Sequence, residues 1–411
     1  MEEDPLDSVL EKYFDNIGTE EQNYIIPLTS SSPFTREDLK SAIKTLLSGY
    51  VTQGEKVKRF EEKFADYLDV EHAIMVNSGS SANLLALKTL TDSNYSNNVE
   101  KGKVLTPAVT WSTTIFPIHQ SGLTPKLVDI DLGSYTLDIQ TLEENIDDAT
   151  VGIMPVHLLG NPCNMDQITR LAERNDLFIL EDCCEAHGAE WKSNKVGSIG
   201  DIGTFSFYFS HHMTTIEGGI LVTDNDEIAQ IAKSIRAHGW IKDRDDKEEI
   251  AQKYPELDSR FLFVTEGYNL RSTEINAALG LKQLDRISEN IEKRREIARY
   301  WNKEIEQRFS KEVILNEQQE NGLHSWFAYP IVLRDSKKKE VVETLEEEGI
   351  ETRPIVAGNI AEQPCMESIK HEKTSLKNAE KVMEDGFYVG LHKDIEKPEA
   401  LINALKKAFR K

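Results

Sequence analysis

Short apolar segments alternate with helical stretches between residues 73 and 222, and this alternation limits the possible folds of the chain more than any other feature. The strand candidates are AIMV (73–76), KVLT (103–106), KLVDI (126–130), VGIMPV (151–156), LFIL (177–180), TFSF (204–207) and GILV (219–222). Helical patterns lie between them, for example in SSANLLALKTL and NMDQITRLAERN. Such alternation predicts an α/β fold with a doubly wound, mainly parallel sheet. In such sheets, ligands bind at the carboxyl ends of the strands.

The rest of the chain indicates a second, smaller domain. We expect residues 1–27 to be a weakly ordered N-terminal extension, residues 28–283 a large domain, and residues 284–411 a linking helix with a small domain. The linking helix is predicted to begin near Ser272 and to run past residue 305, because apolar residues recur there at three-, four- and seven-residue steps. The small domain has strand candidates at 325–333 and 350–356 with helices after each, so an α+β arrangement is expected.

The charge balance excludes several classes of partner. The chain has 48 Lys and Arg against 71 Asp and Glu, so its net charge is -23. Nucleic acid and anionic lipid should repel such a protein. No run of about 18 apolar residues is present, so no membrane span is expected. The acidic start, MEEDPLDSVLEKYF, has no apolar signal region, and we expect a cytoplasmic protein.

A glycine- and serine-rich turn follows the first strand candidate. Gly79, Ser80 and Ser81 lie in NSGSSANLLAL, between a strand and a helix. Small residues let backbone N–H groups approach a phosphate, and the helix N-terminus favours its negative charge. The alternative is an ordinary helix cap. The segment alone does not distinguish a phosphate site from a cap, so the phosphate interpretation needs support from other segments.

Two further residues follow strand candidates at the same edge of the sheet. Trp111, after the strand at 103–106, could lie flat on a pyridine ring, although a core tryptophan is the alternative. Asp182 follows the strand at 177–180, and a carboxylate there can hold a pyridine nitrogen protonated. A helix-capping aspartate is the alternative. His187 could pack over the same site or be structural.

The segment GTFSFYFSHHMTTIEGG contains the remaining polar candidates. Ser206 could bond a cofactor phosphate, and His211 and His212 follow it by five and six residues, ahead of Glu217. Adjacent histidines could be metal ligands, but neighbours in an extended segment point to opposite sides and no third ligand is evident. No metal is therefore expected. The four cysteines form no CxxC motif, so a disulfide framework or zinc site is not expected either.

Together these segments make sense as a pyridoxal phosphate site, and their order and spacing resemble the DegT/DnrJ/StrS family of nucleotide-sugar aminotransferases. That family consists of pyridoxal phosphate-dependent enzymes of fold type I. The resemblance covers nearly the whole chain and includes VTQGEKVKRFEEKFADYL (51–68), VDIDLGSYTLD (128–138), PVHLLGNPCNMD (155–166) and GYNLRSTEINAALGLKQL (267–284). Their occurrence in this order is more specific than any one motif.

One departure from the family pattern determines the implied chemistry. Family members have a Schiff-base lysine five residues after the serine that resembles Ser206, and His211 stands there in this chain. A subgroup of the family, the sugar 3-dehydratases, has this exchange. The resemblance implies pyridoxal or pyridoxamine phosphate as cofactor, a nucleotide-linked 4-keto-6-deoxy sugar as substrate, glutamate as amino donor and release of ammonia. No cysteine lies between Cys184 and Cys365, so no iron–sulfur cluster is expected.

The resemblance also gives roles to individual residues. It makes His211 the catalytic acid–base, since a neutral imidazole can take a proton from the cofactor and return it to the leaving hydroxyl. Glu185, in EDCCEA, is implied in cofactor binding, and His212 and Thr52 are implied in substrate binding.

Two more residues have implied roles, each with a plainer alternative. Asn269 matches a residue that reaches the cofactor phosphate across a dimer interface, which implies a homodimer with shared active sites. Arg353 is a candidate for binding a glutamate carboxylate or a sugar-nucleotide phosphate. The alternatives are a turn residue for Asn269 and a surface salt bridge for Arg353.

Two other functions stay open at this point. One is an aminotransferase that works without the lysine, and the other is a catalytically inactive relative that binds a nucleotide sugar. The sequence does not identify the nucleotide or the configuration of the sugar.

Overall fold

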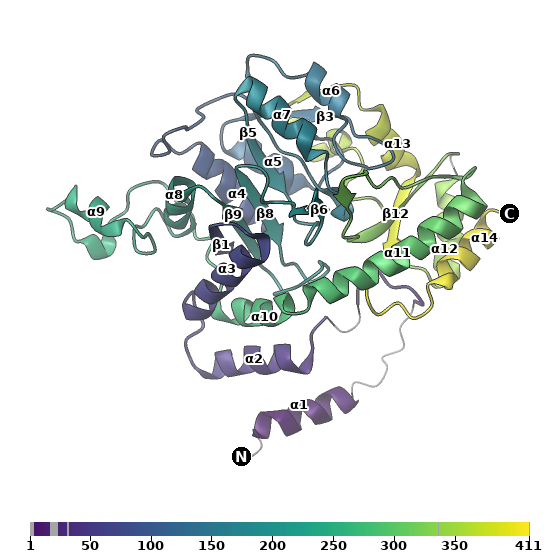
Figure 1. Cartoon of the computed structure of the whole chain (residues 1–411), viewed down its shortest axis with the longest axis horizontal. Helices are drawn as coiled ribbons and strands as arrows, with labels where there is room; N and C mark the ends of the chain where they lie inside the picture. The colour runs from purple at the N-terminus through teal and green to yellow at the C-terminus, as the bar shows by residue number, and fades with distance from the viewer. Residues whose placement is uncertain (1–3, 17–23, 31–32, 336, 411) are drawn as a thin grey trace.

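The computed structural model describes residues 4–16, 24–30, 33–335 and 337–410. Its centre is an eight-stranded sheet (Figure 1). In spatial order its strands are β1 (His72–Val76), β9 (Gly219–Thr223), β8 (Ile202–Ser206), β5 (Phe178–Asp182), β4 (Thr150–Ile153), β2 (Lys103–Pro107), β3 (Thr124–Val128) and β14 (Glu372–Lys373). Only β9 is antiparallel to its neighbours, so the predicted mainly parallel sheet is confirmed.

Helices cover both faces of this sheet, because successive residues of its strands are apolar and point to opposite faces. In β1, Ile74 and Val76 belong to one buried cluster, whereas Ala73 and Met75 belong to another. The helices of the large domain are α3 (Glu55–Leu68), α4 (Gly79–Leu90), α5 (Ser112–Gln120), α6 (Ile139–Glu144), α7 (Met165–Asn175) and α8 (Asp226–Arg236). Burial on two faces is the arrangement expected for parallel strands joined by helices, so the doubly wound architecture is confirmed.

The small domain is α+β, as predicted. Its sheet consists of β10 (Val313–Ile314), β12 (Ala328–Leu333), β15 (Gly386–Gly390) and β13 (Thr352–Arg353). Helices α12 (Lys338–Glu347) and α14 (Glu399–Ala408) share with it a core that contains Trp301 and Tyr329, and α13 (Lys377–Asp385) packs against β12 and β15 through a separate cluster. Strand β14, which follows β13 in sequence, pairs with β3 of the large sheet. The C-terminal part of the chain therefore contributes to both sheets.

The predicted single linking helix is wrong, because the structure has two helices there. They are α10 (Glu274–Leu284) and α11 (Ile287–Phe309), and Arg286 between them has φ -125° and ψ 8°. Its guanidinium donates to Asp38 at 2.9 Å. Asp38 belongs to α2 (Arg36–Leu47), where it forms a capping box with Thr35. This contact with another helix stabilises the break, and apolar periodicity cannot reveal it.

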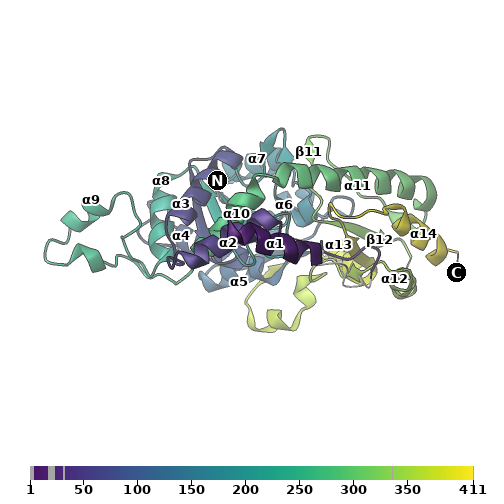
Figure 2. The ribbon, with the colours of Figure 1, turned by 90° about the horizontal axis from the view of Figure 1, so that it is seen from below.

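The remaining elements lie at the periphery. Helix α1 (Pro5–Asn16) packs beside α2 through an ion pair of Lys44 with Asp4, so part of the extension is ordered; residues 17–23 lie outside the described residues. An arm with α9 (Lys247–Gln252) projects from the large domain (Figure 2). Strands β6 (Glu190–Trp191), β7 (Asn194–Lys195) and β11 (Gly322–Leu323) form a small third sheet.

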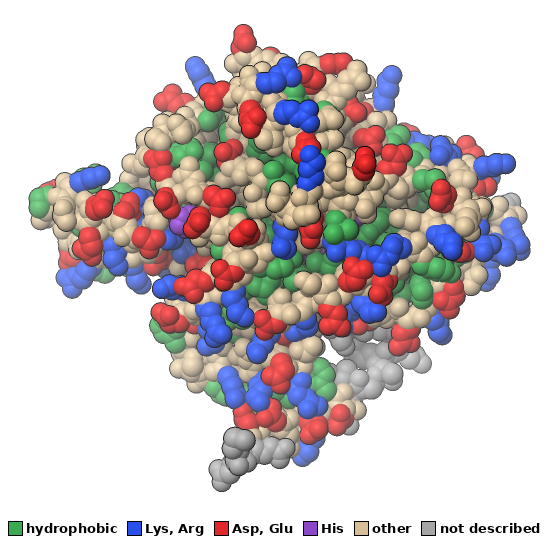
Figure 3. Space-filling view, in the orientation of Figure 1, with side chains coloured by type: hydrophobic (Ala, Val, Ile, Leu, Met, Phe, Trp, Pro, Cys, Tyr) green, Lys and Arg blue, Asp and Glu red, His purple; other side chains and the backbone are tan. Residues whose placement is uncertain are grey.

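Charged side chains of both signs are distributed over the surface. On the face seen in Figure 3, acidic and basic side chains are interspersed over all parts of the molecule. Within the described part of the chain, every helix is too short or too polar to cross a lipid bilayer.

Candidate active site

Asp182 lies at the carboxyl end of β5, where the sequence placed it. The residue is 4% exposed. Its Oδ2 accepts hydrogen bonds from the amide of Asn83 at 2.9 Å and the hydroxyl of Thr114 at 2.8 Å. Oδ1 accepts the backbone N–H of Cys184 at 3.2 Å. Donors from α4 and α5 thus fix a carboxylate at the ligand-binding edge of the sheet, where it can accept a pyridinium N–H.

The predicted phosphate residues meet at the N-terminus of α4. A Cβ atom on Gly79 would lie 2.5 Å from Cβ of Ser206 and 2.8 Å from Sγ of Cys184. Only glycine therefore allows the start of this helix to approach the end of β8. The first N–H groups of a helix have no acceptor within the helix, and together with the hydroxyl of Ser206 they form a cradle for an anion.

The three serines of this turn stabilise it. The side chain of Ser78 caps the helix by accepting the N–H of Ser81 at 3.1 Å, so this N–H already has a partner. The hydroxyl of Ser80 bonds that of Thr113 at 2.7 Å, which connects the turn to the first turn of α5. Ser80 and Ser81 thus both lie in the first turn of α4, and the N–H of Ser81 is occupied by the cap residue Ser78.

Trp111 is 61% exposed, so the alternative of a core tryptophan is wrong. The residue immediately precedes α5, whose first turn bonds both Ser80 and Asp182 through Thr113 and Thr114. An exposed indole therefore stands beside an anion cradle and a buried carboxylate. This set of groups fits a phosphate-bearing pyridine: the cradle for the phosphate, the indole for the ring face and the carboxylate for the ring nitrogen.

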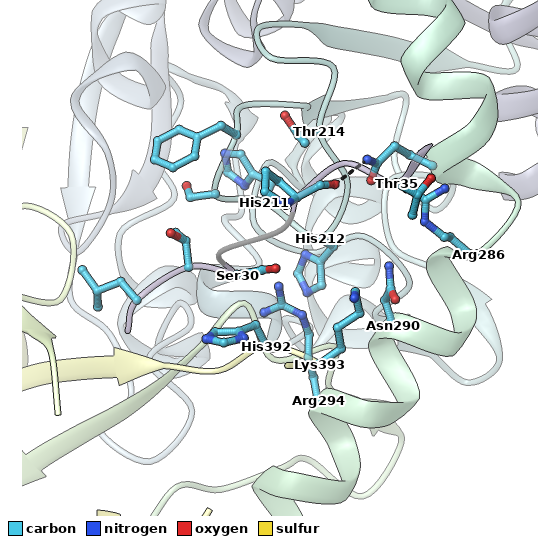
Figure 4. A pocket seen from close by; sticks show the side chains of 16 residues that line it. Ser30, Thr35, His211, His212, Thr214, Arg286, Asn290, Arg294, His392 and Lys393 are labelled. Atoms are coloured by element: carbon cyan, nitrogen blue, oxygen red, sulfur yellow. Dashed lines mark hydrogen bonds between the residues drawn. The ribbon is translucent and has the colours of Figure 1, made fainter. Parts of the chain in front are cut away.

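His211 follows β8 in a turn and lines a cavity between the two domains (Figure 4). Its ring lies 5.2 Å from that of Phe327, centroid to centroid, and its Nδ1 is enclosed without a hydrogen-bond partner. Burial, with the positive charge of Arg294, lowers the pKa of His211 to about 3. The imidazole is therefore neutral at physiological pH and can accept a proton.

The cavity around His211 is lined by cationic and polar residues from several parts of the chain. They include Ser30 and Thr35 from the N-terminal segment, Arg286, Asn290 and Arg294 from the α10–α11 region, and His392 and Lys393 after β15. Its only lysine, Lys393, forms an ion pair of 2.8 Å with Asp394. Among the residues that line this cavity, no lysine stands in place of His211.

His212 does not point away from His211, as an extended segment would require. The two histidines lie in a turn, and both rings contact Phe327 and His187. The expectation of opposite sides is therefore wrong, because the strand ends at Ser206. His212 is buried and its Nε2 bonds the carbonyl oxygen of Ser325 at 3.0 Å. Its predicted contact with substrate stays a prediction that this bond does not favour.

His187 and Glu185 follow Asp182 and occupy different environments. His187 is fully buried against aromatic rings, among them Phe205 and Phe207, which favours the structural alternative. Glu185 accepts the backbone N–H of Leu159 at 2.9 Å, and burial raises the pKa of its carboxyl to about 7. Glu185 can therefore be protonated near neutral pH.

Three predicted residues lie apart from this cluster within the single chain. Asn269 is exposed and accepts from Arg271 at 3.1 Å, and Thr52 is also exposed. Arg353 forms an ion pair of 2.9 Å with Glu351, as its plainer alternative supposed. The roles of these residues stay predictions, and that of Asn269 requires a second subunit.

Sequence reasoning missed Asn83, Thr114 and Glu181. Asn83 is a polar residue inside the apolar stretch NLLAL, and that contrast was the available signal for a buried bond. Glu181, next to Asp182, accepts from the backbone of Ile199 and Gly200 at 2.8 and 2.7 Å. These bonds fix the end of β5, and alternation along a strand does not predict them.

Glu181 also belongs to the one group of three possible metal ligands found among the described residues, with His157 and Cys183. The Nε2 of His157 bonds Glu181 at 3.0 Å, and its Nδ1 accepts the N–H of Cys163 at 3.0 Å. Both ring nitrogens are thus engaged in hydrogen bonds within the fold. This arrangement favours a structural role for the group.

Comparison with known proteins identifies the family. The model of the DegT/DnrJ/EryC1/StrS aminotransferase family matches residues 34–406. The chain belongs to this family. Among curated members, it is 38% identical to the GDP-4-keto-6-deoxy-D-mannose 3-dehydratase of Yersinia pseudotuberculosis, over 93% of this chain and 98% of the relative.

Solved structures of similar proteins support the fold. One is a histidine-to-asparagine variant of GDP-4-keto-6-deoxymannose-3-dehydratase with bound GDP-perosamine; it matches with a TM-score of 0.86 and 36% identity, over 92% of this chain and 100% of that one. The Escherichia coli enzyme with bound hydrated pyridoxal phosphate matches with a TM-score of 0.83 and 35% identity, over 92% and 99%. Fold type I, predicted from the sequence, is confirmed.

A third structure is a double variant of the same dehydratase. In it, a histidine is changed to lysine and the serine directly before that histidine to asparagine; it matches with a TM-score of 0.83 and 36% identity, over 91% of this chain and 100% of that one. In the present sequence, serine directly precedes histidine only at Ser210–His211.

Proposed function

We propose that this family member is a pyridoxal/pyridoxamine phosphate-dependent 3-dehydratase that removes the C3 hydroxyl group of a nucleotide-linked 4-keto-6-deoxy sugar. L-Glutamate is the amino donor. The sugar exchanges its C3 hydroxyl for hydrogen, and glutamate becomes 2-oxoglutarate and ammonia, so atoms and electrons balance. The named relatives act on a GDP-linked sugar, and GDP is therefore the first nucleotide to test.

The observation that carries the proposal is His211, a neutral imidazole in the position of the family's lysine. A lysine there would tether the cofactor and complete transamination, whereas histidine can only transfer protons. The Ser210–His211 pair matches the serine and histidine exchanged in the variant of the dehydratase. This match supports dehydration over transamination, which is the second candidate.

Each part of the site has a task in this reaction. Pyridoxamine phosphate, when bound, supplies an amine for the sugar ketone and a ring that accepts electrons. Asp182 would hold the ring nitrogen, Gly79, Ser80 and Ser206 would hold the phosphate, and Trp111 would cover the ring face. His211 accepts a proton at an imidazole nitrogen and then donates it to the departing C3 hydroxyl, as a base that becomes the acid.

Assembly and location follow from the same proposal. Asn269 completes the phosphate site of a second subunit, so the active form is a homodimer with shared sites. Its exposure in the single chain leaves it available for that contact. Arg353 binds an anionic group of glutamate or of the nucleotide sugar after leaving its ion pair with Glu351. The protein acts in the cytoplasm, where nucleotide sugars and glutamate are present, and binds neither nucleic acid nor membrane.

Mass spectrometry of products tests this function. The purified protein is given glutamate, cofactor and a panel of GDP-, CDP-, dTDP- and UDP-linked 4-keto-6-deoxy sugars. The proposal requires a product that has lost one oxygen atom from the sugar and gained no nitrogen. A product that carries an amino group would favour the aminotransferase, and binding without turnover would favour an inactive relative.

A further inference from the structure

A buried arginine lies behind the proposed catalytic histidine. Arg294, on α11, is 7% exposed, and its guanidinium donates to the carbonyl oxygens of Trp326 at 3.1 Å and Phe327 at 2.8 Å. A third bond goes to the carbonyl oxygen of Leu391, and all three come from Nη1. The helix is thus connected to the loop before β12 and to the segment after β15. Carbonyl groups do not neutralise the charge.

The other cations of this cavity have carboxylate partners. Arg286 bonds Asp38 on α2 at 2.9 Å, and Lys393 bonds Asp394 at 2.8 Å. Arg294 has no carboxylate within 4.0 Å among the residues that the structure describes; the charge of Asp394 reaches it only from farther away. Burial lowers the pKa of Arg294 to about 10, which leaves it charged near neutral pH.

The remaining titratable groups near His211 are histidines and one tyrosine. His187, on the loop after β5, His212, beside His211, and His392, after β15, are buried, and burial with the charge of Arg294 lowers the pKa of each. They are neutral near pH 7. The ring of Tyr208 lies 6.2 Å from that of His211 between centroids. Among these groups, Arg294 is therefore the charge without a carboxylate partner that acts most strongly on His211.

We propose that Arg294 is a positioning residue that holds the Phe327 ring against the His211 imidazole and adds its charge to burial in opposing protonation of that imidazole. This inference rests on the proposed function of His211 as a base. A positive charge in a region of low dielectric opposes a second positive charge nearby. The hydrogen bond to the carbonyl of Phe327 fixes the loop whose ring lies 5.2 Å from His211. Charge and position thus act on the same imidazole.

The structure offers a matched control in the next residue of the helix. Arg295 also donates to two carbonyl oxygens, those of His324 at 2.9 Å and Gly188 at 2.8 Å. Its charge acts on His324 and not on His211. Arg295→Gln therefore removes a charge and the same kind of hydrogen bonds from the same helix.

The test is the pH profile of kcat/KM between pH 3 and 9 for the cofactor-loaded enzyme and its variants. For Arg294→Gln, we expect the fall at acid pH to move upward by about one pH unit or more, toward the ordinary histidine value of about 6.5. Arg294→Lys and Arg295→Gln should keep the acid limb at the pH of the unchanged enzyme, whatever their effect on the maximal kcat/KM. A parallel drop of Arg294→Gln at all pH values, without a shift, would mean a structural role only and overturn the inference.

Asn290→Asp keeps the inference testable if Arg294→Gln does not fold. Asn290 lies one helical turn before Arg294 and lines the same cavity, so an aspartate there can pair with the guanidinium. We expect the acid limb to move upward again, and an unshifted profile would overturn the inference. If the unchanged enzyme forms no dehydrated product, or His211→Asn retains full turnover, the proposed function fails instead, so the two failures are distinguishable.

Discussion

Asn83 and Asp182 form a buried hydrogen bond of 2.9 Å that ties α4 to the end of β5. The amide of Asn83 and the hydroxyl of Thr114 are both neutral donors, so they fix the position of the carboxylate without cancelling its charge. This arrangement suits a carboxylate whose ionic partner is a bound ring.

Asp182→Asn should abolish retention of the cofactor and have a smaller effect on the stability of the fold. The new amide keeps the shape but loses the negative charge and turns one NH₂ toward other donors. We expect the variant to lose its cofactor on dialysis and to lose about 100-fold or more in turnover, since electrostatic groups of active sites contribute on that scale. Absorbance of bound cofactor and kcat are the measurements. Thr114→Val is the control, with a loss of about 1–3 kcal/mol in unfolding free energy and a smaller effect on turnover.

His211→Asn should keep the binding of cofactor and sugar but lose product formation. Asparagine has similar reach and polarity but cannot accept a proton near neutral pH. General acid–base groups contribute about 100- to 10,000-fold, and His211 serves two proton transfers, so the loss should be at the upper end. Single-turnover rates measure the loss.

His212→Asn is the neighbouring control. It loses the hydrogen bond to the carbonyl of Ser325, which is worth about 1 kcal/mol of stability, and should retain most of its turnover. If the two variants exchanged their effects, the proton would be transferred by His212 and the assignment would be off by one residue.

Borohydride treatment with pyridoxal phosphate separates histidine from lysine at this position. The unchanged protein should give no reduced lysine adduct in the active site, because His211 cannot form the linkage. His211→Lys should give a stoichiometric adduct at residue 211, which peptide mass spectrometry can locate. An active-site adduct in the unchanged protein would contradict the placement of His211.

The buried histidines predict loss of stability in mild acid. Burial is the first cause that lowers the pKa of His187, His211, His212, His324 and His392. Below pH 6.5 these histidines bind protons in the unfolded chain but stay unprotonated in the folded chain, so unfolding is favoured as pH falls. Each such histidine contributes up to about 1.4 kcal/mol per pH unit.

A smaller set of carboxyl groups opposes this loss. Burial raises the pKa of Glu185 to about 7, so between pH 7 and its ordinary value near 4.5 the folded state binds this proton first and gains stability as pH falls. Glu61 and Asp201 act in the same direction. The buried His157 does so too, because Cys183 and Cys163 raise its pKa well above the ordinary value against the effect of burial. The five histidines with a lowered pKa outnumber these four groups, and the thermal midpoint should fall between pH 7.5 and 5.5. A higher midpoint at pH 5.5 would contradict the burial of the histidines as neutral groups.

Local patterns in the sequence predicted the strands of the large sheet and the residues at their carboxyl ends. Gly79 comes after β1, and Asp182 and Ser206 end β5 and β8; carboxyl ends of parallel strands share one edge, so their meeting there was predictable. Contacts between distant segments were not predictable. The break at Arg286 depends on Asp38, and the environment of His211 depends on Arg294, and neither pairing has a local pattern.

The turn after β8 shows the same limit. Two adjacent histidines suggest opposite directions if the strand continues, but the strand ends at Ser206 and both rings turn toward Phe327. A tertiary contact decides the direction of each ring, and periodicity within the segment cannot.

The fate of the glutamate nitrogen tests the central claim most directly. The enzyme is supplied with ¹⁵N-labelled glutamate, cofactor and the nucleotide 4-keto-6-deoxy sugar that it accepts, and the label is measured in ammonium and in the sugar. A 3-dehydratase with His211 as its acid–base should release one labelled ammonium for each sugar that loses its C3 oxygen, and the sugar should contain no label. Label retained on the sugar at C4, with the C3 oxygen still present, would contradict the account.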